Sequence, residues 1–314
     1  MKIRGLVQKK GSLKHLGKDI WKARYVYLMI LPVFIWFLLF CYWPMYWLRI
    51  SFYDYSLYKG FEGSAFVGLQ NFIDLVTGRQ FWKMIRNVLL LNLYSLAVGF
   101  PAPIIFSLIL NEMRLQKGKK LVQTVSFLPH FISMVALVTI VKEFLSPTFG
   151  LSADILEFFG KTPIYFLGDK KYFRTIMVVS GIWQEMGYSA IVYLSALTAL
   201  DVNLYEAAMV DGANRWQRLR HITLPGIMPT IIIMLILRIG NLITTGYEKI
   251  YLLQNSINLE VSEVISTYVY KEGLLKMNYS EATTAGLFNS VVAFIMVFVA
   301  NKISKRYSDS AGLW

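Results

Sequence analysis

Residues 206–212 read Glu-Ala-Ala-Met-Val-Asp-Gly, and after nine further residues comes Ile222-Thr223-Leu224-Pro225. The segment combines good helix formers with charged residues, and it lies between two long apolar stretches. A charged helix in that position has to lie outside the bilayer, because charges are costly in hydrocarbon. We therefore expect it to contact another molecule at the membrane surface.

The rest of the chain has the composition of a membrane protein. Of its 314 residues, 56% are apolar and only 16% are charged, whereas soluble domains carry about 25% charged residues. A bilayer core needs roughly 20 apolar residues per helix, and backbone groups in lipid must be paired within helices or closed barrels. The composition therefore predicts an all-α membrane protein with six transmembrane helices. They fall at about residues 26–47, 87–110, 121–141, 173–200, 229–251 and 285–301.

The net charge of +13 is sorted by side of the membrane. If the N-terminus is cytoplasmic, the inner segments hold 18 Lys and Arg and 6 acidic residues, and the outer loops hold 10 of each kind. An excess of positive charge marks the cytoplasmic side. This distribution predicts that both termini are cytoplasmic, and it favours anionic lipid over nucleic acid as the partner of the basic residues.

We expect four regions along the chain. They are a basic cytoplasmic tail (1–24), a first transmembrane helix with an external loop (25–86), a permease-like transmembrane core (87–301) that includes the inner loop 201–228, and a cytoplasmic tail (302–314). Apolar spacing predicts helices over residues 66–86 against the outer surface. Pro101, Pro103 and Pro129 predict bends in the second and third spans, which either serve packing or open a cavity.

The inner loop carries local signals for two short helices. Asp201 can cap the first helix, and Glu206 then falls in its first turn, where negative charge suits the helix dipole. Gly212 predicts a break, because glycine tolerates backbone angles that other residues do not. We expect a second helix over residues 213–221, with Pro225 at the entry to the fifth span.

The spacing E-A-A-x3-G-x9-I-x-L-P resembles the EAA loop of permease subunits in binding-protein-dependent ABC importers. Further short motifs extend the likeness over nearly the whole chain: WPM at 43–45, GFPAP at 99–103, LPHF at 128–131, IWQE at 182–185 and GLW at 312–314. The chain is similar to type I ABC importer permeases of the sugar group, and within it to the LplB-like permeases. The resemblance implies the MetI-like fold with cytoplasmic EAA coupling helices, a place in the bacterial plasma membrane, and import of an oligosaccharide.

The same resemblance implies several partners. These are a second, related permease, two ATPase subunits, and an extracytoplasmic sugar-binding protein. Glu206, Ala207, Ala208 and Gly212 are the implied coupling residues, with Glu206 pairing with a basic residue of the ATPase and Gly212 allowing the turn. ATP and Mg would be bound by the partner ATPase, because this chain lacks the P-loop spacing.

A sugar site needs hydrogen-bonding side chains and aromatic surfaces beside a cavity. Polar residues at membrane depth usually face the interior of the bundle. The predicted pathway residues are therefore Trp183, Gln184, Glu185, Tyr188, Asn92, His130 and Asn241. Each of them could instead make an interhelical hydrogen bond that holds the bundle together, and Glu185 could pair with Arg238.

The sequence predicts a transport subunit without a catalytic, cofactor or metal site of its own. Its three histidines lie in separate segments, and its single Cys41 permits no disulfide within the chain. Two alternatives remain open. An EAA loop could also serve an importer of amino acids, peptides or phosphate. Alternatively, the chain could be an ATPase-independent channel or secondary transporter whose loop resembles the EAA loop by chance.

Overall fold

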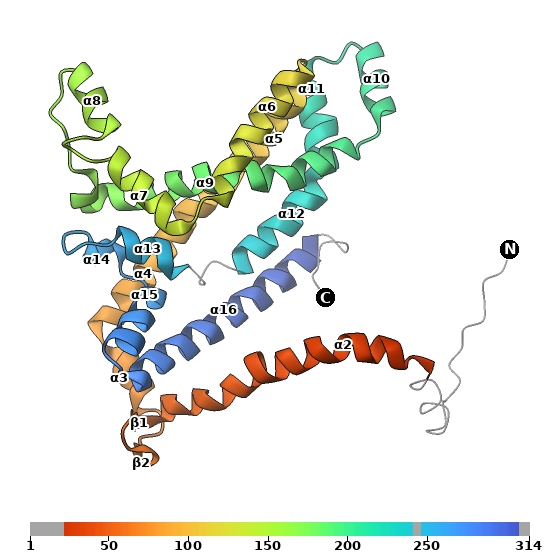
Figure 1. Cartoon of the computed structure of the whole chain (residues 1–314). Helices are drawn as coiled ribbons and strands as arrows, with labels where there is room; N and C mark the ends of the chain where they lie inside the picture. Colours follow the sequence, from red (N-terminus) through yellow and green to blue (C-terminus); the bar gives the residue numbers. More distant parts are fainter. Residues whose placement is uncertain (1–21, 241–245, 308–314) are drawn as a thin grey trace. The chain divides into compact units, whose positions relative to one another are not determined.

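The computed structural model describes residues 22–240 and 246–307 (Figure 1). The chain divides into two compact units, Met1–Ile50 and Ser51–Trp314. One long helical run, Arg24–Phe52, of 29 residues, lies in the first unit up to Ile50, and its last two residues belong to the second. It is built from α2 (Arg24–Phe37), a π-helical turn η1 (Leu38–Tyr42) and a 3-10 segment η2 (Trp43–Phe52). It contains the first predicted span.

The second unit begins with a feature that the all-α prediction missed. Strands β1 (Tyr53–Ser56) and β2 (Gly60–Phe66) form an antiparallel hairpin in which Tyr53 lies opposite Phe66. Gly60 has a φ of 61°, which allows the chain to turn back at this point. Two helices follow, α3 (Gln70–Thr77) and α4 (Arg79–Tyr94), as predicted for residues 66–86.

The second predicted span is longer than expected because α4 continues into it. The run passes through the π-helical turn η3 (Ser95–Gly99) into α5 (Pro101–Glu112), which gives 34 helical residues, Arg79–Glu112. Pro101 occupies the start of α5, where a missing N–H is tolerated. The π-helical turn η3, which precedes Pro101, interrupts the regular α-helical pattern of backbone hydrogen bonds.

The third predicted span, 121–141, is broken at the bend that Pro129 predicts, and the break is sharper than a kink within one helix. Helices α6 (Gln116–Phe127) and α7 (Met134–Phe144) are separated by the 3-10 turn η4 (Leu128–Phe131), and the two segments meet at 106°. Pro129 cannot donate a backbone hydrogen bond, and Ile132 adopts an extended conformation. Ser133 then caps α7 by accepting a hydrogen bond from the backbone N–H of Ala136 at 3.3 Å.

The predicted fourth span corresponds to a single helix, α9 (Lys170–Thr198), of 29 residues. It follows α8 (Leu151–Phe158) and the short turn η5 (Phe166–Gly168). Asp169 caps α9 by accepting a hydrogen bond from the Lys171 backbone N–H at 2.9 Å. Because α9 contains several polar residues, it is not among the helices apolar enough to be assigned to a membrane by composition.

The prediction for the fifth span, 229–251, is wrong. After α10 (Val202–Val210), the helical run Arg215–Ile239 contains 25 residues and comprises α11 (Arg215–Arg218), η6 (Leu219–Thr223) and α12 (Leu224–Gly240). Beyond the gap in the described residues, α13 (Tyr247–Leu253) is a separate helix. The remaining elements are α14 (Leu259–Ser262), α15 (Ile265–Tyr270), η7 (Lys271–Leu275) and α16 (Tyr279–Tyr307).

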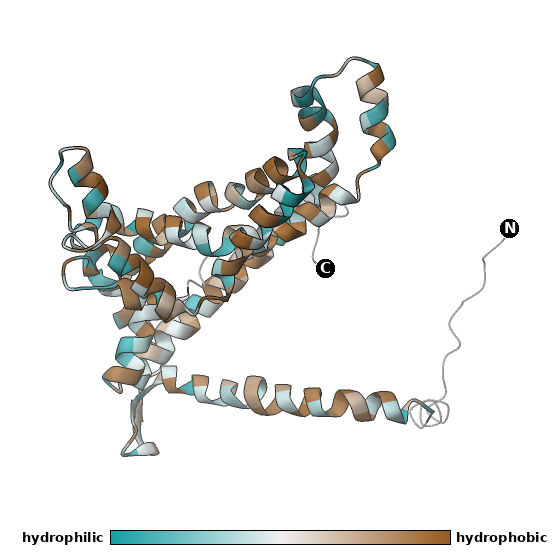
Figure 2. Cartoon of the chain, turned by 45° about the horizontal axis from the view of Figure 1, so that its top comes forward, coloured by the Kyte–Doolittle hydropathy of each residue, from teal (hydrophilic) through white to brown (hydrophobic). Residues whose placement is uncertain are grey.

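Four helical runs of the described chain are long and apolar enough to cross a membrane, and a fifth is added if the bent α6–α7 pair forms one span. The chain is therefore a multi-pass membrane protein. Figure 2 shows brown, hydrophobic residues along the long helices, interrupted by teal, hydrophilic residues. Helices α10–α11 and α13–α14 lie at opposite ends of the second unit (Figure 1).

The core of the second unit is organised around α9. One cluster packs Phe173 of α9 against Val88, Leu137 and Ile250, and so joins α4, α7 and α13. Another packs Leu194 and Leu197 of α9 against α5 and α12. As a result, α9 is the scaffold on which the helices that carry the polar candidates are assembled.

Candidate functional site

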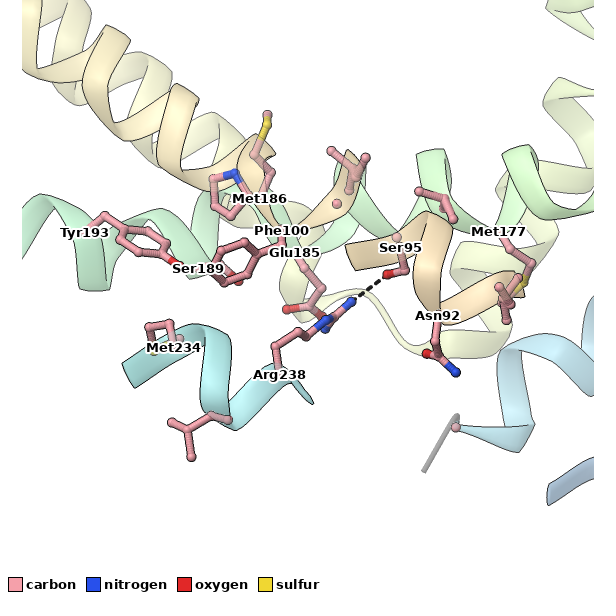
Figure 3. Close-up of a pocket in the computed structure, with 18 residues that line it drawn as sticks. Asn92, Ser95, Phe100, Met177, Glu185, Met186, Ser189, Tyr193, Met234 and Arg238 are labelled. Carbon is pink, nitrogen blue, oxygen red and sulfur yellow. Dashed lines mark hydrogen bonds between the residues drawn. The ribbon is translucent and has the colours of Figure 1, made fainter. Parts of the chain in front are cut away.

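A cavity of about 430 Å³ lies between α4–α5, α9 and α12. Its volume is within the range of small-molecule sites. Most of its lining is apolar, and its polar side chains are Asn92, Ser95, Glu185, Ser189 and Arg238. Figure 3 shows Glu185 on α9 and Arg238 on α12 turned toward the same space.

Three of the predicted pathway residues come together at the bend between α6 and α7. The Glu185 carboxylate lies 3.1 Å from Nδ1 of His130. The His130 ring stacks on Tyr188 with centroids 3.9 Å apart and planes inclined by 3°. Phe127 lies beside both rings, with its centroid 5.8 Å from that of Tyr188 and 6.3 Å from that of His130. The result is a flat aromatic surface beside a carboxylate at the edge of the cavity.

A close helix crossing holds this arrangement in place. Gly187 on α9 faces the backbone of α6, and a Cβ atom at this position would lie 2.1 Å from the carbonyl oxygen of Ser126. No residue other than glycine fits such an approach without moving α6. Gly187 thus allows His130, in η4 just after α6, to reach Tyr188, the next residue of α9.

The predicted ion pair between Glu185 and Arg238 is not formed. Arg238 Nη2 instead donates a hydrogen bond to Ser95 Oγ at 2.7 Å, which joins α12 to η3 (Figure 3). The Glu185 carboxylate lies within hydrogen-bond distance of His130 Nδ1 instead, a contact that becomes an ion pair when the imidazole is protonated. Since Glu185 remains about half exposed (49%), this pair contributes at most about 1 kcal/mol to stability.

The other predicted candidates occupy different environments. Asn92 lines the cavity and also donates to the Val88 carbonyl oxygen at 2.9 Å. Gln184 is buried, and Trp183 is exposed outside the cavity lining. Asn241 lies outside the described residues.

Sequence reasoning missed Lys249, which is buried on α13. Its ammonium donates to the Met177 carbonyl oxygen at 3.3 Å, and it lies next to Gly181 of the cavity wall. The signal was available, because Lys249 lies inside the predicted fifth span, 229–251, and a lysine predicted at membrane depth is expensive and usually functional. Among the described residues, no group of three His, Cys, Asp or Glu side chains could hold a metal ion.

The inner loop has the predicted cap and the predicted break. The Asp201 carboxylate accepts a hydrogen bond from the Asn203 backbone N–H at 2.9 Å and caps α10. Gly212 has a φ of 80°, in the left-handed region that favours glycine. Glu206 and Ala207 are exposed on α10, and Ala208 is partly buried.

The second predicted helix of this loop requires a correction. It begins at Arg215 rather than at residue 213, because Asn214 and Gln217 form a capping box with hydrogen bonds of 2.8 and 2.9 Å. It does not end at 221, but continues through η6 into α12. The Tyr205 hydroxyl lies 2.9 Å from Thr223 Oγ1, and this hydrogen bond connects α10 to η6.

Comparisons with known proteins agree with this architecture. Residues 85–309 match the family described as "Binding-protein-dependent transport system inner membrane component". The polygalacturonan/rhamnogalacturonan transport system permease protein YteP of Bacillus subtilis is 42% identical over 307 residues, which cover 98% of this chain and 96% of YteP. Protein LplB of the same organism is 41% identical over 304 residues, 95% of each chain.

Solved structures give the same result. A chain in the crystal structure of a bacterial ABC transporter involved in the import of the acidic polysaccharide alginate aligns with a TM-score of 0.86 and 42% identity, over 93% of this chain and 99% of that chain. A second structure, of an alginate ABC transporter in complex with an alginate pentasaccharide-bound periplasmic protein, aligns with a TM-score of 0.85. The protein described here therefore belongs to the family of binding-protein-dependent transport system inner membrane components.

Proposed function

We propose that this chain is the permease subunit of an ATP-driven importer and forms half of a translocation pathway for an oligosaccharide. The observation that carries the proposal is the unbroken helical run from Arg215 to Ile239. This run begins at the inner loop and reaches the cavity through Arg238. One rigid element therefore connects the surface where a motor could act to the site where cargo would pass.

The local contacts suit such a transmission. A push on α10 is passed to the long helix through the Tyr205–Thr223 contact and through the turn at Gly212. At the other end, Arg238 is bonded to Ser95 of η3. A displacement of α12 would break or re-form that hydrogen bond, and would change the cavity between α9 and α12.

The motor is an ATPase that grips α10. This helix exposes Leu204, Met209 and Val210, which are unusual on a charged loop unless a partner covers them. Glu206 lies on the same exposed helix and would pair with a basic residue of the ATPase, with Ala207, Ala208 and Gly212 completing the contact. Two ATPase subunits would serve two related permeases, and they would bind the ATP and Mg.

The nature of the cargo follows from relatives and from the cavity. YteP is described as a polygalacturonan/rhamnogalacturonan permease, and the structural neighbour imports a polysaccharide. The stacked rings of His130 and Tyr188 offer a flat surface for the C–H face of a sugar, and the Glu185 carboxylate offers an acceptor for its hydroxyl groups. An oligosaccharide delivered by an extracytoplasmic binding protein is the cargo that best fits this combination.

In this proposal the chain crosses the bacterial plasma membrane six times. The crossings are the four apolar runs, the bent α6–α7 pair and α9. Both termini then lie in the cytoplasm with α10, and α13–α15 lie on the outer side. This orientation agrees with the excess of Lys and Arg in the inner segments.

The test is ATP-dependent uptake by the complete importer in proteoliposomes, together with co-purification of the ATPase. Glu206→Lys should abolish both, whereas Glu112→Lys, at another exposed carboxylate on the inner side, should leave both intact. Uptake that survives without ATP and collapses with the ion gradient would identify a secondary transporter. A partner binding protein that binds only amino acids or peptides would refute the oligosaccharide assignment.

A further inference from the structure

A group of basic side chains surrounds one carboxylate at the end of the second unit remote from α10. Lys170 donates to the Glu260 carboxylate at 2.5 Å. Lys83 and Arg86 on α4 are close enough to lower the pKa of Glu260 further, after the larger effect of Lys170. Arg174, one turn after Lys170 on α9, completes the group, which we call the basic cluster: Lys83, Arg86, Lys170 and Arg174.

Arg174 is held in place, but its hydrogen-bonding capacity is not used up. Its Nη2 donates to Asn87 Oδ1 at 3.4 Å, and Asn87 in turn donates to the backbone carbonyl oxygens of Glu260 and Glu263 at 2.9 and 3.0 Å. The Nε atom of Arg174 is buried and has no hydrogen-bond partner in the described chain. A buried donor without a partner is costly, so this position suits an incoming acceptor.

The other cations of the cluster are also not neutralised. Lys83 and Arg86 are exposed and make no ion pair within 4.0 Å in residues 22–240 and 246–307. The nearby Glu263 carboxylate is bonded to Gln80 and pairs with Lys271 at 3.3 Å. Within the basic cluster, Lys170 is thus the one residue that forms an ion pair among the described residues, although the outer loops as a whole carry equal numbers of basic and acidic residues.

The basic cluster lies on the two helices that wall the cavity. On α4, Asn87 lies one turn before Leu91, which lines the cavity; on α9, Arg174 lies one turn before Met177 and Val178, which also line it. Further along this direction follow Lys249, beside Met177, and then Arg238 within the lining. The basic cluster therefore lies on the helices that wall the cavity, one helical turn beyond the lining residues, and Arg238 is the cation of this set that lies within the lining.

We propose that the basic cluster binds carboxylate groups of an anionic, uronate-type oligosaccharide at the outer mouth of the cavity. This inference rests on the proposed function and adds the charge of the cargo. A mouth lined by charges of one sign with low-dielectric walls concentrates ligands of opposite charge. Arginine suits carboxylates in particular, because its planar guanidinium can donate two parallel hydrogen bonds.

Position and burial favour this ligand over two other anionic partners. Lipid headgroups surround a membrane protein on all sides, but the basic cluster lies on the helices that wall the cavity. An acidic surface of the binding protein could contact the exposed Lys83 and Arg86, but Arg174 is partly buried between helices and accepts only a small group. A carboxylate on a flexible sugar chain is small enough to reach all of them.

The experiment measures cargo binding to the purified complete transporter by saturation-transfer NMR, in phosphatidylcholine nanodiscs at low salt. The probes are tri-galacturonate and the neutral maltotriose. The Lys83→Gln/Arg86→Gln double variant changes only exposed side chains, and Lys161→Gln removes an exposed outer cation elsewhere as the matched control. The double variant should weaken tri-galacturonate binding by about tenfold or more, and high salt should reduce that difference because it screens exposed charges. Maltotriose binding should not change, and Lys161→Gln should match the wild type.

Several outcomes would overturn the inference. One is tri-galacturonate binding that is undetectable or is the same in the double variant. Another is an unchanged affinity for tri-galacturonate together with weaker docking of the binding protein. That result would show that the basic cluster contacts the binding protein and not the sugar. If phosphatidylglycerol in the nanodiscs abolished the difference between variant and wild type, the cluster would bind lipid. Wild-type uptake of neutral oligosaccharides alone would refute the anionic cargo but leave the proposed function intact, whereas uptake of neither class would refute both.

Discussion

Replacing Gly187 by alanine tests the helix crossing on which the candidate site depends. The added Cβ would lie 2.1 Å from the Ser126 carbonyl oxygen and 2.7 Å from the Phe127 nitrogen, and ordinary contact begins at 3.4 Å. The α6 backbone must therefore move away from α9 by about 1.3 Å at this point. Overpacking of this kind costs about 1–3 kcal/mol.

The displacement should also disturb the site. His130 lies in η4, the turn that follows α6, so its 3.9 Å stack on Tyr188 and its 3.1 Å contact with Glu185 should both loosen. We expect Gly187→Ala to lower the thermal stability of the purified transporter and to reduce the initial rate of oligosaccharide uptake.

Gly286→Ala on α16 is the matched control, because a Cβ there meets nothing within 4 Å. Both changes raise helix propensity by about 1 kcal/mol, so this term cancels when the two variants are compared. The measurement is thermal unfolding of the complete complex in detergent, together with uptake in proteoliposomes. If Gly187→Ala unfolded at the same temperature as Gly286→Ala and transported normally, α6 and α9 would not cross as described.

Three further predictions address loop 201–228 and the ion pair between Lys170 and Glu260. Gly212→Val puts a β-branched residue at a φ of 80°, which costs about 1–2 kcal/mol. The Gly212→Val variant should impair ATP-driven uptake. The control is Gly160→Val, which has a similar φ of 69° in the loop between α8 and η5 and should leave uptake unchanged. Equal losses of uptake in the two variants would argue against a coupling role for Gly212. Asp201→Ala removes the cap of α10, should cost about 0.5–2 kcal/mol, and should speed amide hydrogen exchange across Val202–Val210; unchanged exchange would contradict the cap. The pKa of Glu260 is lowered chiefly by its hydrogen bond to Lys170. The stabilisation from this pair is therefore fully present at pH values above the ordinary pKa of glutamate. It is lost as the pH falls through the lowered pKa of Glu260 in the folded protein. The wild type should therefore exceed Glu260→Gln in thermal stability at neutral pH and lose that advantage in acid; an advantage that grew on acidification would contradict the pair.

The amino-acid sequence alone determined the features that depend on neighbouring residues. The cap at Asp201 and the break at Gly212 each act within about one helical turn, so residue type and spacing are sufficient to locate them. Long apolar stretches likewise located the four described helical runs that are apolar enough to cross a membrane, while the count of six spans stays a prediction. The EAA spacing predicted the family that residues 85–309 match.

Helix ends and bends were predicted less well, because apolar composition does not change where a helix in a membrane stops or turns. Pro129 was expected to bend a span, but the 106° angle depends on how α6 and α7 pack. Likewise, the predicted span 229–251 ran from α12 into α13 across residues 241–245, which lie outside the described structure, although Gly246, the N-cap of α13, is a local signal for a break.

Tertiary structure alone decided which polar residues meet. His130 and Glu185 are 55 positions apart, and Ser95 and Arg238 are 143 apart. Their contacts depend on the close approach of helices at Gly187 and on the packing around α9. For that reason Glu185 pairs with His130 rather than with Arg238, and the basic cluster from α4 and α9 emerged only when the helices were assembled.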